Sequence, residues 1–116
     1  KVDGHIVLLC TGFHKRHQND RTKLVWANPQ VTVSASEWLF KRGSIMHGVE
    51  GPSTDAPDNN DFAQHRYCRD KGITHFEWLV NLEATLGKGE FEFIGLPIKF
   101  KGGSGSPVRA VAVINE

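Results

Sequence analysis

The chain has 116 residues, and its 39% hydrophobic and 23% charged content is typical of one small globular domain or part of one. Fourteen Lys and Arg face thirteen Asp and Glu, and this near-balance argues against a dedicated nucleic-acid binder. No apolar run approaches the ~20 residues that span a bilayer, so we expect no membrane contact. The two cysteines are too few for a disulfide scaffold and favour a reducing, cytoplasmic location.

The first third of the sequence predicts a strand, a long loop and a short helix. Residues Ile6–Cys10 form a continuous apolar run, which is typical of a strand covered on both faces. Residues 14–30 are polar and predict a surface loop of a length that is often functional. Ser34 and Glu37 fit a capping box at the start of a helix, and Gly43 is suited to end that helix.

The middle third predicts a second strand and a second helix. Residues 45–49 form the strand, which runs into a stretch rich in Gly, Pro, Ser and Asp. Asn60 or Asp61 can cap a helix over residues 62–71, because a short polar side chain accepts a hydrogen bond from the first free amides. Gly72 is placed to end this helix.

The last part of the chain is rich in predicted strands. Residues 73–78 predict a strand, and residues 79–86 predict a turn or short helix. The two strongest strands are residues 91–100 and 108–114, which flank a Gly/Ser turn. This order predicts an α/β protein with a mixed β-sheet and a few flanking helices, in a single domain or partial domain over residues 1–116.

Three features that could carry chemistry have simpler structural explanations. The Gly-rich turn at residues 102–106 is followed by Pro107 and a strand, so we expect a hairpin or crossover turn and no phosphate loop. The basic stretch 14–17 is typical of a solvated loop, with contact to an anionic substrate as the alternative. Ser53 lacks the nucleophile-elbow pattern, and Cys68 falls in the middle of a predicted helix, in a context that we do not expect to lower the pKa of its thiol. We therefore expect a turn serine and an inert thiol.

One cluster of potential metal ligands remains. His65, Cys68, His75 and Glu77 lie within thirteen residues of sequence. His65 and Cys68 are three apart and share a helical face, whereas His75 and Glu77 are two apart and share a strand face. Imidazole and carboxylate together suit Zn²⁺, Mn²⁺ or Fe²⁺. Because such groups also arise by chance, ordinary surface polarity is the alternative interpretation.

Several short motifs, spread over the whole chain, resemble those of one enzyme family. In the C-terminal half they are His65-x11-Glu77, Leu79-x-Asn81-Leu82, Phe93-Ile-Gly-Leu-Pro97-x-Lys99 and Gly102-Gly-x-Gly-Ser-Pro-Val-Arg-Ala-Val-Ala112. Upstream they are Val7-Leu-Leu-Cys-Thr-Gly12, Ser36-Glu-Trp-Leu39 with Arg42-Gly43, and Gly51-Pro-Ser-Thr-Asp55. Together they resemble the cyclase family of metal-dependent hydrolases, a group that includes bacterial kynurenine formamidases and isatin hydrolases.

The resemblance implies a fold and a chemistry. The fold would correspond to the C-terminal part of the family's swivelling β/β/α domain. The activity would be attack of metal-activated water on a formamide, amide or lactone carbonyl of a small-molecule substrate. His65 and Glu77 fall where the family has its later metal ligands, so the resemblance implies that they hold a divalent cation, Zn²⁺ or Mn²⁺.

The chain also departs from the family pattern. The family's first metal-binding cluster, His-x-Gly-Thr-His, is absent from the 116 residues, and Glu50 stands where the family turn usually carries Asp. The general acid/base would lie in that absent N-terminal half. We therefore expect a C-terminal half-domain that opens at Lys1 without Met, has little activity alone, and needs a companion N-terminal polypeptide or assembles as a homo-oligomer. The alternative is a non-catalytic remnant that self-associates or binds a partner.

Four aromatic residues bear on substrate recognition and packing. Phe13 and Trp26 flank the predicted loop and are candidates for a substrate-binding pocket. Trp38 and Trp78 lie within predicted elements, so we expect them to pack in the core.

Overall fold

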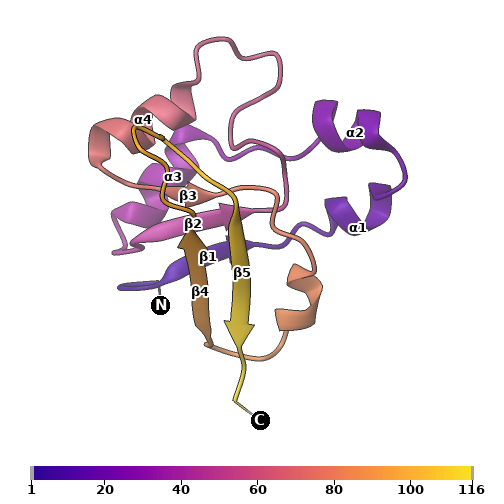
Figure 1. Ribbon diagram of the computed structural model, residues 1–116, viewed down its shortest axis with the longest axis vertical. Coiled ribbons are helices and arrows are strands. Elements are labelled where there is room, and N and C mark those ends of the chain that lie inside the picture. Colours follow the sequence, from indigo (N-terminus) through magenta and orange to yellow (C-terminus); the bar gives the residue numbers. More distant parts are fainter. Residues whose placement is uncertain (1, 116) are drawn as a thin grey trace. The chain divides into compact units, whose positions relative to one another are not determined.

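The computed structural model describes residues 2–115 and confirms the α/β class, with parallel and antiparallel pairing in two separate sheets (Figure 1). The chain divides into two compact units, the first ending at Glu83 and the second beginning at Ala84. Each unit is described by itself. Among the described residues, no helix is long and apolar enough to cross a membrane.

The first unit is built on a parallel three-stranded sheet of order β1-β2-β3. Its strands are β1 (Ile6–Leu9), β2 (Met46–Val49) and β3 (His75–Phe76), as Figure 1 shows. The central strand has no room for a side chain at Gly48, because a Cβ there would lie 2.6 Å from Leu79 Cδ1 and 2.9 Å from Leu8 Cδ2. Glycine at this position therefore lets the side chains of Leu79 and Leu8 pack closely against β2, and a larger residue would have to displace them.

Two strand predictions need correction. Among the described residues β1 pairs with β2 alone, and all four of its residues are half-buried, so the strand is less fully covered than the continuous apolar run predicts. The strand expected over residues 73–78 has only two paired residues in β3. The apolar run at β1 does not reveal that the strand lies at the edge of a small sheet. The run at residues 73–78 likewise does not reveal that only two of its residues pair.

Two short helices replace the loop expected over residues 14–30. They are α1 (Phe13–His17) and α2 (Arg21–Trp26). The Asp20 carboxylate caps α2 by accepting a hydrogen bond from the Lys23 N–H at 3.0 Å. Leu24 is the buried residue of α2, and neither helix has an apolar stripe long enough to show a helical period in the sequence.

The helix α3 (Val33–Phe40) is confirmed, but its cap lies two residues earlier than predicted. The Thr32 hydroxyl accepts the hydrogen bond from the Ala35 N–H at 3.2 Å, and the Ser34 hydroxyl pairs with Thr32 instead. Both residue types are good caps, so the sequence alone does not separate them.

The helix α4 (Ala63–Lys71) is also confirmed, together with its end at Gly72, which has φ +66°. Neither Asn60 nor Asp61 caps it, and its first residue follows Phe62 with φ 48°. Instead the Asp55 carboxylate accepts hydrogen bonds from the N–H groups of Gln64, at 2.8 Å, and His65, at 3.0 Å. The cap thus comes from a turn outside the helix and fixes the first turn of α4.

The core of the first unit contains both apolar and polar side chains. Its buried apolar residues are Leu24, Val31, Leu39, Val49, Cys68, Leu79 and Leu82, whereas the largest fully buried side chains are His47, Gln64, Thr54, Cys68 and Ser36. Gln64 satisfies part of this polarity by donating to the Ser36 hydroxyl, which joins α4 to α3. Trp38 and Trp78 are 52% and 47% exposed, so their expected core packing is wrong.

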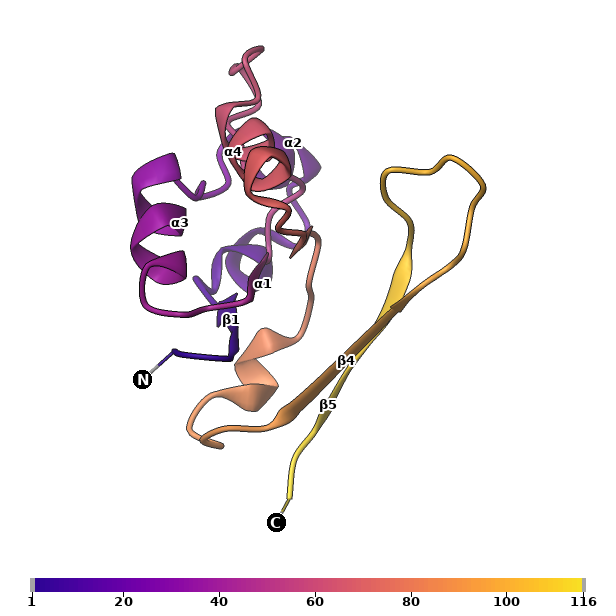
Figure 2. The ribbon, with the colours of Figure 1, turned by 90° about the vertical axis from the view of Figure 1, so that its left-hand side faces the viewer.

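The second unit is an antiparallel hairpin. Its strands are β4 (Glu92–Pro97) and β5 (Val108–Val113), paired from Glu92 opposite Val113 to Pro97 opposite Val108. Figure 2 shows the two strands side by side, joined by the Gly/Ser loop. The hairpin expected around residues 102–106 is confirmed. A 3-10 helix (Leu82–Thr85) lies where one unit passes into the other and confirms the turn or short helix predicted there.

Candidate metal centre

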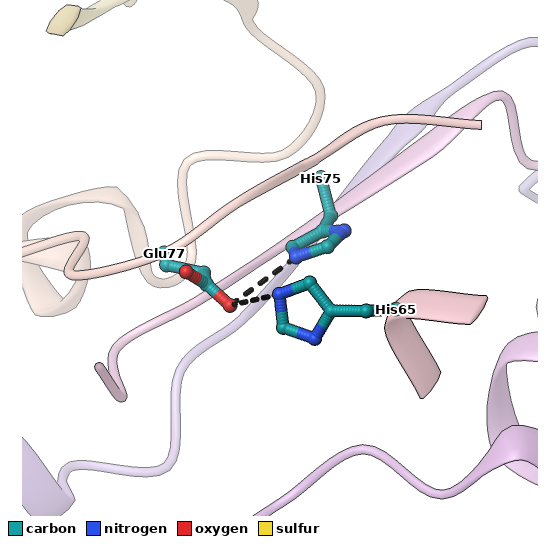
Figure 3. A group of neighbouring side chains, drawn as sticks. All are labelled: His65, His75 and Glu77. Carbon is teal, nitrogen blue, oxygen red and sulfur yellow. Dashed lines mark hydrogen bonds and ion pairs between the residues drawn. The ribbon is translucent and has the colours of Figure 1, made fainter. Parts of the chain in front are cut away.

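The side chains of His65, His75 and Glu77 converge on one point, as Figure 3 shows. His65 is in the first turn of α4, His75 is the first residue of β3, and Glu77 directly follows that strand. The Asp55 cap sets the first turn of α4, and parallel pairing of β3 with β2 sets the other two residues. The fold therefore brings together His65 and Glu77, the two predicted ligands.

The spacing of the donor atoms is that of a metal-binding group. Glu77 Oε1 lies 3.4 Å from His65 Nε2 and 3.2 Å from His75 Nε2. Donors at the corners of a tetrahedron, each about 2.0–2.1 Å from a zinc ion, lie about 3.3–3.4 Å apart. Within residues 2–115 this is the one group of three or more His, Cys, Asp or Glu side chains close enough to share an ion. Cys68 is not part of it, because its thiol is buried beside the Gln64 amide.

Asp55 controls which nitrogen of His65 faces this group. Its carboxylate is 4% exposed and lies 2.6 Å from His65 Nδ1, in addition to the two amides it caps. Burial raises the pKa of Asp55, but the hydrogen bonds from His65 and from the Gln64 and His65 amides outweigh it and hold that pKa below its ordinary value. The ionised carboxylate keeps a proton on Nδ1, so Nε2 is the nitrogen that faces Glu77.

Glu77 is held as a carboxylate. Its Oε1 accepts the Thr54 N–H at 3.1 Å and faces His75 Nε2. Burial raises the pKa of Glu77, yet the hydrogen bonds of His75 and Thr54 and the charges of His75 and His65 lower it below its ordinary value. His65 Nε2 and Glu77 Oε1 therefore face each other, and either a proton on Nε2 or a bound cation can hold the two atoms together. Imidazole nitrogens and a carboxylate oxygen are ligands that divalent metal ions take, so the residues present fit such an ion.

His47 lies behind His75 and has no such support. It is fully buried, and within residues 2–115 neither of its ring nitrogens has a hydrogen-bond partner. Its ring stacks on that of His75 with centroids 5.4 Å apart and planes 6° apart. Burial, followed by the nearby charge of His75, lowers the pKa of His47 to about 4, with Glu77 opposing the shift, so its ring is neutral at pH 7. His47 and Asp55 are the two residues at the centre that sequence reasoning missed.

Their positions explain why they were missed. His47 pairs with His75 across β2 and β3, a register that appears only when the strands are aligned. Asp55 ends the Gly51–Asp55 stretch. The one sequence feature that suggests its role is the presence of a carboxylate a few residues before a predicted helix.

Of the two predicted substrate-binding residues, one lines a pocket and the other is largely exposed. Phe13 lines a small pocket with Thr11, Asn28 and Glu50, at the carboxyl ends of β1 and β2, whereas Trp26 is 64% exposed and is not among the lining residues. Glu50 is buried, and its Oε2 accepts hydrogen bonds from the N–H of Thr11, at 2.6 Å, and from the Thr11 hydroxyl. Glu50 therefore ties the ends of β1 and β2 together.

Comparisons with known proteins converge on one family. Residues 2–56 match the Cyclase family, described as "Putative cyclase". A kynurenine formamidase of Salinibacter ruber is 39% identical over 73 residues, which are 63% of this chain and 34% of that relative. A kynurenine formamidase of Bacillus thuringiensis (strain Al Hakam) is 34% identical over 83 residues, 72% of this chain and 39% of the relative. The chain thus spans little more than a third of the length of these relatives, and together the matches support a cyclase-family, kynurenine-formamidase-like protein.

Proposed function

We propose that this chain forms part of a metal-dependent hydrolase that acts on a formamide, amide or lactone carbonyl. The observation that carries the proposal is the pair formed by His65 Nε2 and Glu77 Oε1, 3.4 Å apart, with Asp55 holding the far side of the imidazole. The kynurenine formamidase relatives make an aryl formamide such as N-formylkynurenine the first substrate to test.

Each residue of the centre has a defined part in this chemistry. A divalent ion, Zn²⁺ or Mn²⁺, bound at such a site polarises a carbonyl and lowers the pKa of a water molecule toward neutrality. His65 Nε2 and Glu77 Oε1 would hold the ion. Asp55 keeps the proton of His65 on Nδ1, and the Thr54 N–H fixes the carboxylate of Glu77. Such oriented support is what ligating imidazoles and carboxylates need to keep their geometry.

The proposal includes residues outside these 116. The matched stretches cover 34–39% of the relatives, and a catalytic zinc ion usually takes three protein ligands, against the two predicted here. We place the general acid/base in the part of the relatives that the chain does not span. A longer parent chain, a companion N-terminal polypeptide or a second copy of this chain would supply it, so the chain alone has little activity.

The test is hydrolysis of N-formylkynurenine by the chain alone and by the chain co-expressed with a segment that carries the His-x-Gly-Thr-His motif. We expect little hydrolysis alone and chelator-sensitive hydrolysis by the pair. His65→Gln and Glu77→Gln should each abolish it, while Lys41→Gln, whose exposed ion pair with Glu37 lies on α3, should not change it. Family-like rates from the chain alone would contradict the incomplete site. Failure of the pair on formamides, amides and lactones would contradict the hydrolase.

A second candidate is a non-catalytic module that self-associates. The hairpin unit favours it, because Leu96, Ile98 and Phe100 are each more than half exposed. Sedimentation of the purified chain separates the two candidate functions: an oligomer that stays metal-free in the presence of Zn²⁺ favours the non-catalytic module.

The two cysteines Cys10 and Cys68 are free thiols, which supports a cytoplasmic location.

A further inference from the structure

We infer that His75 is a third metal donor, so that His65, His75 and Glu77 form a site for one divalent transition-metal ion within this chain. The inference rests on the ion-binding part of the function proposed above and extends it. It predicts that the chain binds its ion without residues supplied from elsewhere.

Local backbone geometry places His75 correctly for this role. Residues two apart along an extended strand share a face, so His75 at the start of β3 and Glu77 just after it project to the same side. The side chain of His75 is 11% exposed, and its Nε2 faces Glu77 Oε1 (Figure 3). On the other side its ring stacks on the buried His47, which limits ring rotation.

The three donors are also right in number and kind. Two imidazole nitrogens and one carboxylate oxygen make the same donor set as the His₂Glu sites of zinc hydrolases. The two distances from Glu77 Oε1, 3.4 and 3.2 Å, both match the edge of a tetrahedron around a zinc-sized ion. A fourth position stays open for water or substrate. A catalytic zinc ion usually takes three protein ligands, so with His75 the number of ligands is complete without the part of the relatives that this chain does not span.

The two imidazoles differ in their support, and this ranks them. Asp55 accepts from His65 Nδ1, whereas Nδ1 of His75 is buried and has no hydrogen-bond partner among the described residues. In the metal-free chain His75 can donate its Nε2 proton to Glu77. To bind an ion through Nε2, it must move that proton to the unpartnered Nδ1. His75 is therefore the weaker donor of the two.

The experiment is a titration of the chelator-stripped chain with Co²⁺, followed by absorption spectroscopy, and with Zn²⁺ against a chromophoric chelator. We expect one ion per chain and a tetrahedral Co²⁺ spectrum. His75→Gln should weaken binding at least tenfold and change the spectrum, and His65→Gln should weaken it further. The matched control is His17→Gln, a histidine of α1, which should change neither.

A second readout does not depend on whether the variants fold. In the ¹⁵N-labelled wild-type chain, Zn²⁺ should shift the Nε2 resonances of both His65 and His75. A chain that binds no ion, or one in which only His65 Nε2 shifts while His75→Gln binds as wild type, overturns the inference and leaves His75 as a hydrogen-bond partner of Glu77. Hydrolysis by the completed enzyme with an unshifted His75 would retain the proposed function alone. Zn²⁺-induced shifts of both Nε2 resonances without hydrolysis by the completed enzyme would retain the metal site and contradict the proposed function.

Discussion

The two sides of Glu77 are built differently. On one side, the buried Asp55 carboxylate accepts a hydrogen bond from His65 Nδ1 and from the two amides that it caps in α4. On the other side, His75 and His47 stack on each other with three buried ring nitrogens that have no partner among the described residues. Two histidines at one centre thus differ in what holds them: charge and hydrogen bonds hold His65, and ring packing holds His75.

Removal of Asp55 should break the first side and have the largest effect. Asp55→Ala leaves two helix amides and an imidazole nitrogen without their acceptor, so we expect a loss of about 3–5 kcal/mol in the free energy of unfolding. Denaturant unfolding measures it. Asp20→Ala, which removes the exposed cap of α2, is the matched control and should cost about 1 kcal/mol. Equal decreases in the free energy of unfolding of the two variants would show that Asp55 contributes no more than an ordinary helix cap.

Acid should break the second side. The pKa of His47 is about 4 in the folded chain against 6.5 for an unperturbed histidine, so between these values unfolding takes up a proton. The free energy of unfolding of the metal-free chain should therefore fall by up to about 3 kcal/mol as the pH drops from 6.5 to 4. His47→Leu should remove this slope, and His14→Gln on α1 should keep it. An unchanged slope in His47→Leu would assign the titration elsewhere.

The lowered pKa values of Asp55 and Glu77 add a second acid phase. Each carboxylate stabilises the fold above its ordinary pKa, and this stability is lost as the pH falls through its lower folded value. In Asp55→Asn and Glu77→Gln the phase below about pH 4 should shrink while the His47 phase remains. Chemical unfolding between pH 2 and 5 separates them. A Glu77→Gln profile that matches wild type would contradict the charge assigned to Glu77.

The cap of α3 supplies a reference away from the centre and the smallest expected effect. Thr32→Ala should lower the free energy of unfolding by about 1 kcal/mol, because it removes the acceptor of the Ala35 N–H. Ser34→Ala should cost clearly less, since the Ser34 hydroxyl pairs only with Thr32. Thermal unfolding of the two variants checks the order, and the reverse order would restore Ser34 as the cap.

The features that the sequence predicts correctly depend on interactions between residues close in sequence. The glycine that ends α4, the hairpin of β4 and β5, and the strand at β2 depend on residues close in sequence, and all three are confirmed. Motif resemblance placed His65 and Glu77 in one site, and the fold brings their side chains together.

What the sequence could not predict depends on contacts between distant residues. Asp55 caps a helix that begins eight residues later, and His47 meets His75 only through strand register. The sequence predicts a loop where α1 and α2 form, because short polar helices with one buried side chain between them show no helical period. Exposure of Trp38 and Trp78 likewise depends on packing that no local pattern encodes.

The central claim is that His65 and Glu77 hold a divalent ion, and anomalous diffraction from crystals grown with Zn²⁺ tests it most directly. The account predicts one strong peak about 2.0–2.2 Å from both His65 Nε2 and Glu77 Oε1, with the Asp55–His65 hydrogen bond intact. A chain that crystallises with zinc bound only elsewhere, or with His65 Nε2 still facing Glu77 and no peak between them, would contradict it.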